Sequence, residues 1–268
     1  MAGGADGTVG KALEVLDQVA GFGRPVRFSD LLAHSAFPKP TLYRLLQTLV
    51  SQNMLSYDLD RQTYAPGARL MRLAHAAWAQ SSLAQVASPH LLALSAATHE
   101  TVHLAQLDHG QVLYLDKRNA AHPVEMFSQA GKVGPAYCTG VGKAMLAHLD
   151  ATQAEAIIDQ QSFHRFQPAT LTTPAALRRE LQAIRSRGYA FDREEHEPGI
   201  ICIAAPVLAA SGRVLGAVSV TSTTVRTDLG GLEQLAPQVC DTAAAIARDA
   251  AKWSFPDTGT RSLKLAGE

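Results

Sequence analysis

Several features that mark special classes of protein are absent from this chain of 268 residues. Its three cysteines, Cys138, Cys202 and Cys240, lack the paired spacing of a disulfide scaffold, which favours a reducing compartment. No segment of about 18 residues is apolar throughout, and the first residues contain no cationic start followed by an apolar run. We therefore expect a soluble cytoplasmic protein without a membrane partner.

A surplus of one charge is also absent, since 24 Lys and Arg balance 24 Asp and Glu. Residues 1–82 hold 8 basic and 6 acidic residues, a difference too small to indicate nucleic-acid binding by itself. Charged residues make up 18% and hydrophobic residues 47%, which argues against disorder and suits packed cores. The length suits two compact domains.

The segment between residues 27 and 67 has the most specific pattern. Its centre has the period of an α-helix, with an apolar stripe on one side and a polar face on the other. The stripe contains Leu42, Leu45, Leu46, Leu49 and Val50. The polar face contains Lys39, Thr41, Tyr43, Arg44, Gln47 and Thr48. No acidic residue occurs between Ala36 and Asp58, so this face suits a negatively charged groove.

Such a helix alone could be an ordinary amphipathic helix with a solvated face, but its neighbours favour DNA binding. A short apolar helix is predicted around residues 29–33, and two strands at 54–57 and 62–65 flank a polar turn. With an upstream helix carrying Val9, Leu13 and Val19, this is the order of a winged helix-turn-helix, which we assign to residues 1–66. The expected contacts to double-stranded DNA are Lys39, Thr41, Tyr43, Arg44, Gln47 and Arg61.

A linker helix is predicted for residues 67–83, from the helical repeat of Leu70, Leu73, Ala74, Ala77 and Ser81. We interpret it as a dimerisation helix, the alternative being packing inside one domain. Ser88-Pro89 is expected to start a new helix.

Residues 84–253 mix strands with helices. Strands at 101–107 and 111–115 flank a hairpin turn, and strands at 200–207 and 214–221 flank a Ser-Gly-Arg turn. Helices are expected at 174–188 and 228–253. The predicted fold class is therefore α+β, with an antiparallel sheet and covering helices. We expect residues 254–268 to form a disordered tail.

Two short motifs suggest enzymes, and neither holds. His99-Glu100-Thr101-Val102-His103 matches the zinc-protease pattern, but the alternation after Glu100 predicts a strand. At ~3.3 Å per residue the two imidazoles would then lie about 13 Å apart and could not share a metal ion. Gly140-Val141-Gly142-Lys143 resembles a phosphate-binding loop, yet Tyr137 and Ala144 stand where that motif needs Gly and Ser or Thr.

The glycine motif still predicts the start of a helix, whose free N–H groups would suit an anion such as a carboxylate. The alternative is a tight turn that serves only packing. Asp192, Glu194, Glu195 and Glu197 form an acidic cluster near Cys202. The alternatives for it are a metal site or an acid/base pair, but we expect it to be mostly solvated, since loop charges usually are. Cys202 is expected to pack in the core. No metal site or cofactor is predicted.

These strings together resemble the IclR family of bacterial transcription regulators. Residues 37–46, FPKPTLYRLL, match the family's recognition-helix string. Residues 139–144, TGVGKA, residues 188–192, GYAFD, and residues 197–206, EPGIICIAAP, follow in the family's order and spacing. The resemblance covers about residues 8 to 250.

The resemblance implies a GAF-like effector-binding domain in which a small organic acid binds. Its contacts would be Met126, Gly140, Val141, Asp192, Ile200, Cys202, Ser219 and Thr221. Because Asp192 would repel an anion, we expect it to accept from a hydroxyl of the ligand, which favours hydroxy- and oxo-acids. Two departures stand out: Pro40 replaces a Ser that contacts DNA phosphate, and Thr221 replaces a frequent Ser. The turn at residues 58–61 also lacks the usual Gly and predicts a short wing.

The sequence thus predicts a non-enzymatic, ligand-responsive DNA-binding transcription regulator. Two chains would pair and place two recognition helices in successive major grooves of a palindromic operator, with Arg44 on a guanine edge and Lys39 on phosphate. The family implies a homodimer or a dimer of dimers. The alternatives are a DNA-binding module fused to an enzyme that acts on a small carboxylate, and an architectural DNA-binding protein without an effector.

Overall fold

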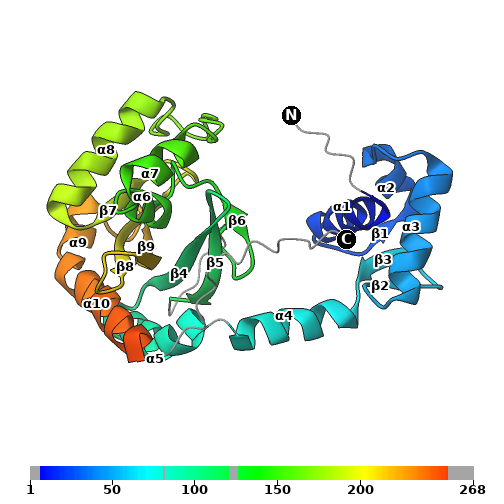
Figure 1. Cartoon of the computed structure of the whole chain (residues 1–268), viewed down its shortest axis with the longest axis horizontal. Helices are drawn as coiled ribbons and strands as arrows, with labels where there is room; N and C mark the ends of the chain where they lie inside the picture. The colour runs from blue at the N-terminus through cyan, green and yellow to red at the C-terminus, as the bar shows by residue number, and fades with distance from the viewer. Residues whose placement is uncertain (1–6, 81, 121–125, 253–268) are drawn as a thin grey trace, which may run out of the picture. The chain divides into compact units, whose positions relative to one another are not determined.

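The computed structural model describes residues 7–80, 82–120 and 126–252 of the chain. It divides the chain into two compact units, Met1–Gln80 and Ser81–Glu268 (Figure 1), which are described separately.

The first unit joins helices to a three-stranded antiparallel sheet in the order β1-β3-β2. Its helices are α1 (Thr8–Gly21), α2 (Phe28–His34), α3 (Lys39–Ser51) and α4 (Ala68–Gln80), and its strands are β1 (Val26–Arg27), β2 (Leu55–Asp58) and β3 (Thr63–Pro66). This is the predicted winged helix-turn-helix, with the β2–β3 hairpin as its wing.

The core of this unit forms around the apolar stripe of α3. Its four leucines are buried against Leu31 of α2, Tyr64 of β3 and the inner face of α1. On α1, Val15, Leu16 and Val19 are buried as expected. Val9 and Leu13 are exposed, so only the second half of α1 covers the core.

The α4 helix follows the wing directly. Leu70 packs against the core of the first unit, whereas Met71 and Leu73 are exposed, Met71 with 75% of its surface. The prediction of a helix over this segment is confirmed. Of the other residues in the predicted seam, Ser81 and the side chain of Ala77 lie outside the described residues.

The second unit is built on a six-stranded antiparallel sheet in the order β6-β5-β4-β9-β8-β7. Its strands are β4 (Thr101–Asp108), β5 (Gln111–Arg118), β6 (Val133–Gly134), β7 (Ala190–Arg193), β8 (Ile200–Leu208) and β9 (Val214–Thr223). Both predicted hairpins are present, β4–β5 and β8–β9.

Helices cover both faces of this sheet (Figure 1). They are α5 (Ser82–Thr98), α6 (Gly140–Leu146), α7 (Ala151–Ile158), α8 (Pro174–Arg187), α9 (Leu229–Glu233) and α10 (Ala236–Lys252). One core lies between the sheet and α5 with α10, and a second lies between the sheet and α6 with α8.

Two helix boundaries differ from the prediction, and both involve proline. The helix α5 runs through Pro89 and does not restart there. The reason is that residues on both sides of Pro89 are buried in the same core: Leu83, Ala84 and Ala87 before it, and Leu91 and Leu94 after it.

The predicted closing helix is instead two helices, α9 and α10. Pro237 lies in the first turn of α10, where a proline needs no backbone hydrogen bond.

Alternation along the strands assigns their side chains to the two faces. The face toward α5 and α10 has large apolar residues such as Val102, Leu104 and Ile203. The face toward α6 has small ones, Ala105 and Ala204 among them.

A β-bulge changes this alternation at one position. The register of β4 and β5 shifts between Leu104 and Ala105, so that Leu104 lies opposite Asp116 and Ala105 opposite Tyr114. Leu115 is the extra residue. The bulge turns Tyr114 to the α6 face of the sheet, together with Ala105.

Candidate functional site

The exposed side of α3 forms a basic, acid-free surface in the first unit. Lys39, Arg44 and Gln47 are exposed, and Tyr43 exposes 55% of its surface beside the ring of Phe28. Thr41 is half-buried. The structure therefore brings the five predicted α3 residues to one helix face, which is free of the core.

The wing is short, as predicted from the missing glycine. The turn after β2 is held by the Asp58 carboxylate, which accepts from the N–H groups of Asp60 at 2.9 Å and Arg61 at 3.0 Å. Arg61 is exposed on this turn.

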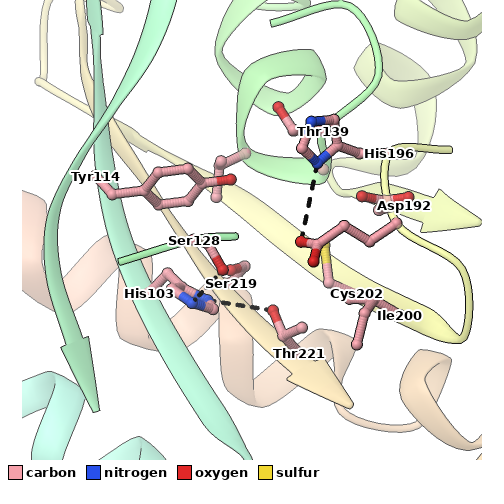
Figure 2. A pocket seen from close by; sticks show the side chains of 13 residues that line it. His103, Tyr114, Ser128, Thr139, Asp192, His196, Ile200, Cys202, Ser219 and Thr221 are labelled. Carbon is pink, nitrogen blue, oxygen red and sulfur yellow. Dashed lines mark hydrogen bonds and ion pairs between the residues drawn. The ribbon is translucent and has the colours of Figure 1, made fainter. Parts of the chain in front are cut away.

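The second unit contains a pocket on the α6 face of its sheet (Figure 2). It is lined by His103, Tyr114, Ser128, Thr139, Gly140, Val141, Asp192, His196, Glu197, Ile200, Cys202, Ser219 and Thr221. The space, counted with its open mouth, is about 380 Å³, which suits a small metabolite.

Strand register brings the floor of the pocket together. His103 on β4 lies opposite Ser219 on β9, Thr221 lies opposite Cys202 on β8, and Cys202 lies opposite Asp192 on β7. All five side chains project to the α6 face, at the end of the sheet where α6 begins. The sheet residues covered by α6 are small and apolar, whereas those at this end are mostly polar.

His103 is the centre of a buried polar network. Its Nε2 lies 2.9 Å from the Ser128 hydroxyl and its Nδ1 lies 3.3 Å from the Thr221 hydroxyl (Figure 2). Burial, with a smaller contribution from Lys117, lowers the pKa of His103 to about 3. The imidazole is therefore neutral, with one ring nitrogen donating and the other accepting.

The expectation that the acidic cluster is mostly solvated is wrong. Glu195 exposes 2% of its surface and Asp192 exposes 7%. Glu195 forms an ion pair with the fully buried Lys143 of α6, and its N–H donates to Asp192 Oδ1 at 2.8 Å. The reason is tertiary pairing, since a buried cation from α6 is available to neutralise the turn after β7.

Asp192 differs from a surface carboxylate in its protonation. Burial, followed by the charge of Glu195, raises the pKa of Asp192 to about 7, although Lys143 opposes this shift. Near neutral pH, both the acid and the carboxylate forms of Asp192 are populated.

The start of α6 approaches the floor of the pocket closely. A side-chain carbon on Gly140 would collide with the Cys202 sulfur, and one on Gly142 would collide with the Ala136 backbone oxygen. Thr139 caps the helix only by its backbone, because its hydroxyl donates to the Pro135 carbonyl. The first N–H groups of α6 are therefore left without helical partners beside the pocket.

At one side of the pocket, the segment of Phe127 and Ser128 is held to the turn after β7. Both carboxylate oxygens of Glu197 accept from the N–H of Phe127, at 3.0 and 2.9 Å. The His196 ring contacts the rings of Phe127 and Phe166, at centroid distances of 5.1 and 4.8 Å. Although partial burial alone would raise it, the pKa of Glu197 is lowered by hydrogen bonds from His196 and Phe127, so the carboxylate stays charged.

Seven of the eight predicted effector residues line this pocket, and Met126 does not. Met126 is buried beside a separate, open depression that it lines with Phe127, Gln129, Lys132 and Glu197.

Sequence reasoning missed the other six lining residues, which are His103, Tyr114, Ser128, Thr139, His196 and Glu197. The signal available for His103 was a single imidazole inside an otherwise apolar strand.

The structure also bears on the protease-like motif. Thr101, Val102 and His103 lie on β4, as predicted, while His99 lies outside the strand with a positive φ of 58°.

In the described ranges, no group of three or more His, Cys, Asp or Glu is arranged to hold a metal ion. Every helix in these ranges is too short or too polar to span a bilayer.

A winged helix with a basic recognition face, joined to a unit with a closed polar pocket, defines the class of ligand-responsive DNA-binding regulators. Comparison with known families agrees. Residues 8–59 match the IclR helix-turn-helix domain, and residues 75–248 match the C-terminal domain of the bacterial transcriptional regulator IclR. The chain belongs to the IclR family of transcriptional regulators.

Relatives and solved structures extend over both units. The HTH-type transcriptional regulator XynR of Escherichia coli is 30% identical over 90% of this chain and 96% of its own length. The crystal structure of the Thermotoga maritima IclR matches with a TM-score of 0.73 and 27% identity, over 91% of this chain and 98% of that one. An IclR homolog complexed with 4-hydroxybenzoate, from Microbacterium hydrocarbonoxydans, matches in fold with a TM-score of 0.79 at 24% identity, over 92% and 100%.

Proposed function

We propose that this regulator binds a palindromic operator as a dimer and is switched by a small hydroxy- or oxo-acid in the pocket of its second unit. The observation that carries the proposal is the pocket itself, which gathers hydroxyls, a neutral imidazole and unpaired backbone N–H groups in a space of metabolite size. A ligand that binds one state of the dimer better shifts its population, and DNA affinity with it.

An acid effector fits the donors of the pocket. The N–H groups of Gly140 and Val141 start a helix beside it and lose no side-chain entropy on binding. Asp192 does not oppose this, because its raised pKa makes the protonated form available, and a protonated carboxyl donates to a carboxylate. The homolog complexed with 4-hydroxybenzoate, a hydroxy acid, supports the same ligand class.

Hydroxyl or oxo groups on the acid fit the opposite side of the pocket. Ser219 and Thr221 present hydroxyls from β9, where the Thr221 hydroxyl also contacts His103. Hydroxyls both donate and accept, so they match a ligand oxygen of either kind. A plain fatty acid would leave these groups unpaired.

Pairing of two chains would involve the exposed apolar residues of the first unit. Met71 and Leu73 on α4 and Val9 and Leu13 on α1 are large and exposed. Covering them with a second copy would remove apolar surface from water and bring two α3 helices to the two half-sites of a palindrome.

Calorimetry tests the pocket. A panel of short hydroxy- and oxo-acids is titrated into the full chain and into the variants Ser219→Ala and Asp192→Ala. We expect at least one acid to bind the native protein, and each variant to weaken it about 5- to 150-fold through the loss of one buried hydrogen bond. If the tightest ligand is an uncharged aromatic compound that both variants bind normally, the proposed acid effector is wrong.

A further inference from the structure

One tyrosine that lines the pocket uses its ring but not its hydroxyl in the described structure. Tyr114 comes from β5, exposes only 6% of its surface, and directs its hydroxyl into the pocket (Figure 2). Among the described residues, that hydroxyl has no hydrogen-bond partner. The ring is buried, whereas the hydroxyl opens onto the pocket, where an atom of a ligand could reach it.

The ring of Tyr114 is contacted by the histidine in the floor of the pocket. The two rings lie at a centroid distance of 5.5 Å and an angle of 62°, and His103 is itself held by the hydroxyls of Ser128 and Thr221. On its other side the ring faces Gly134 of β6, where a side-chain carbon would still fit at 3.6 Å. The contact with His103 therefore orients the Tyr114 ring.

The chemistry of this hydroxyl is that of a neutral donor and acceptor. Burial, then the neighbouring Cys202, Asp192 and Glu197, raises the pKa of Tyr114 well above its ordinary value. No Lys or Arg lines the pocket within the described residues, so the phenol is the strongest side-chain donor on its side. It suits an oxygen atom of the ligand.

That oxygen would bind on the side of the pocket opposite Asp192. In the sheet, β5 and β7 are separated by β4, β9 and β8. Tyr114 and Asp192 reach into the pocket from these two sides (Figure 2). A ligand with a polar group at each end could therefore contact both residues.

We propose that Tyr114 is a specificity-determining residue, whose hydroxyl binds the second oxygen of the effector while the carboxylate lies on the α6 side of the pocket. His103 acts as its positioning residue. The inference rests on the proposed function and deepens it: the pocket selects acids that carry an oxo or hydroxyl oxygen away from the carboxylate. An acid that lacks this oxygen leaves the phenol buried and unpaired.

The test pairs ligands with variants. Hydroxy- and oxo-acids, including 4-hydroxybenzoate and 4-oxopentanoate, are each titrated by calorimetry beside the parent acid that lacks the second oxygen, here benzoate and pentanoate. The proteins are the full native chain, Tyr114→Phe and the control Tyr189→Phe. The control loses a hydroxyl from the same unit, one that donates to Glu233 outside the pocket.

We expect Tyr114→Phe to weaken the oxygen-bearing acid about 5- to 150-fold and to leave the parent acid unchanged, with Tyr189→Phe like the native chain for both. Equal effects on both acids, or none, would overturn the role of Tyr114 while acid binding by the native chain keeps the proposed function intact. If no acid in the panel binds the native chain, the proposed function fails, and this inference fails with it.

A second measurement does not depend on a variant. A phenol that gains a hydrogen bond changes its near-ultraviolet absorption, so saturating the native chain with the oxygen-bearing acid should give a tyrosine difference spectrum that the parent acid does not give. Identical spectra from the two acids would count against Tyr114 even if Tyr114→Phe failed to fold.

Discussion

The protonation of Asp192 should make effector binding depend on pH. A carboxylate ligand is compatible with the acid form of Asp192 and is repelled by the ionised form. With a pKa of about 7, Asp192 is protonated in roughly nine-tenths of molecules at pH 6 and in about one-tenth at pH 8. Affinity should therefore fall by nearly tenfold between these values, or about 1.3 kcal/mol, with most of the loss above pH 7.

The sign of this effect follows from the surroundings of Asp192. Burial, and then the charge of Glu195, raise the pKa of Asp192, whereas Lys143 on α6, the Glu195 N–H and His196 lower it. A bound carboxylate adds a further negative charge and raises it again, so binding should take up protons. Calorimetry in two buffers of different ionisation enthalpy measures that uptake directly.

Two variants distinguish the titration of Asp192 from that of neighbouring groups. Asp192→Asn keeps a neutral donor in place, so it should bind the acid with an affinity that does not change between pH 6 and 8. His196→Gln removes the imidazole beside Asp192 and should keep a fall in affinity with rising pH, displaced to higher pH because His196 lowers the pKa of Asp192. A native affinity that is constant over this range, or an Asp192→Asn variant that retains the native pH profile, would refute the reasoning.

Three other predictions concern DNA binding, assembly and stability. Arg44→Ala should lose about 1–3 kcal/mol of binding free energy at the operator and relax the preference at one base pair. Lys39→Ala should weaken binding to all duplexes alike and reduce the salt dependence of the affinity. Titrations of operator and random duplex at two salt concentrations measure both. A fragment of residues 82–252, which keeps α5 whole, should show a lower oligomeric state by light scattering than the full chain, and an unchanged state would exclude pairing through the first unit. Lys143→Met should lower the free energy of unfolding by about 3–5 kcal/mol, because Glu195 is left buried and unpaired, and adding Glu195→Gln should restore part of it in thermal melts.

Elements with a repeating pattern could be predicted from the sequence. The leucine stripe of α3, the β2–β3 wing and the β4–β5 hairpin follow from local periodicity and turn residues, and the structure confirms them. The exposed residues of α3 that we expect to contact DNA follow from the same period, since one face of the helix is buried and the opposite face is exposed.

The features that sequence reasoning missed depend on contacts distant in the chain. Burial of Glu195 depends on Lys143, 52 residues earlier, and no local pattern indicates that pair. Tyr114 reaches the pocket only because a bulge breaks the alternation of β5 against β4. The helix α5 continues through Pro89 because the core compensates for the lost backbone hydrogen bond, which a local propensity cannot anticipate.

If the pocket controls DNA binding, the effector must change the affinity of the protein for its operator. A labelled duplex, selected by the native protein from a random pool, is titrated with the full chain in the presence and absence of the tightest acid, for the native protein and Ser219→Ala. We expect the acid to shift the operator affinity of the native chain, and Ser219→Ala to need a higher acid concentration for the same shift, while both proteins bind DNA equally well without acid. An acid that binds in calorimetry yet leaves operator affinity unchanged would show that the pocket does not control DNA binding.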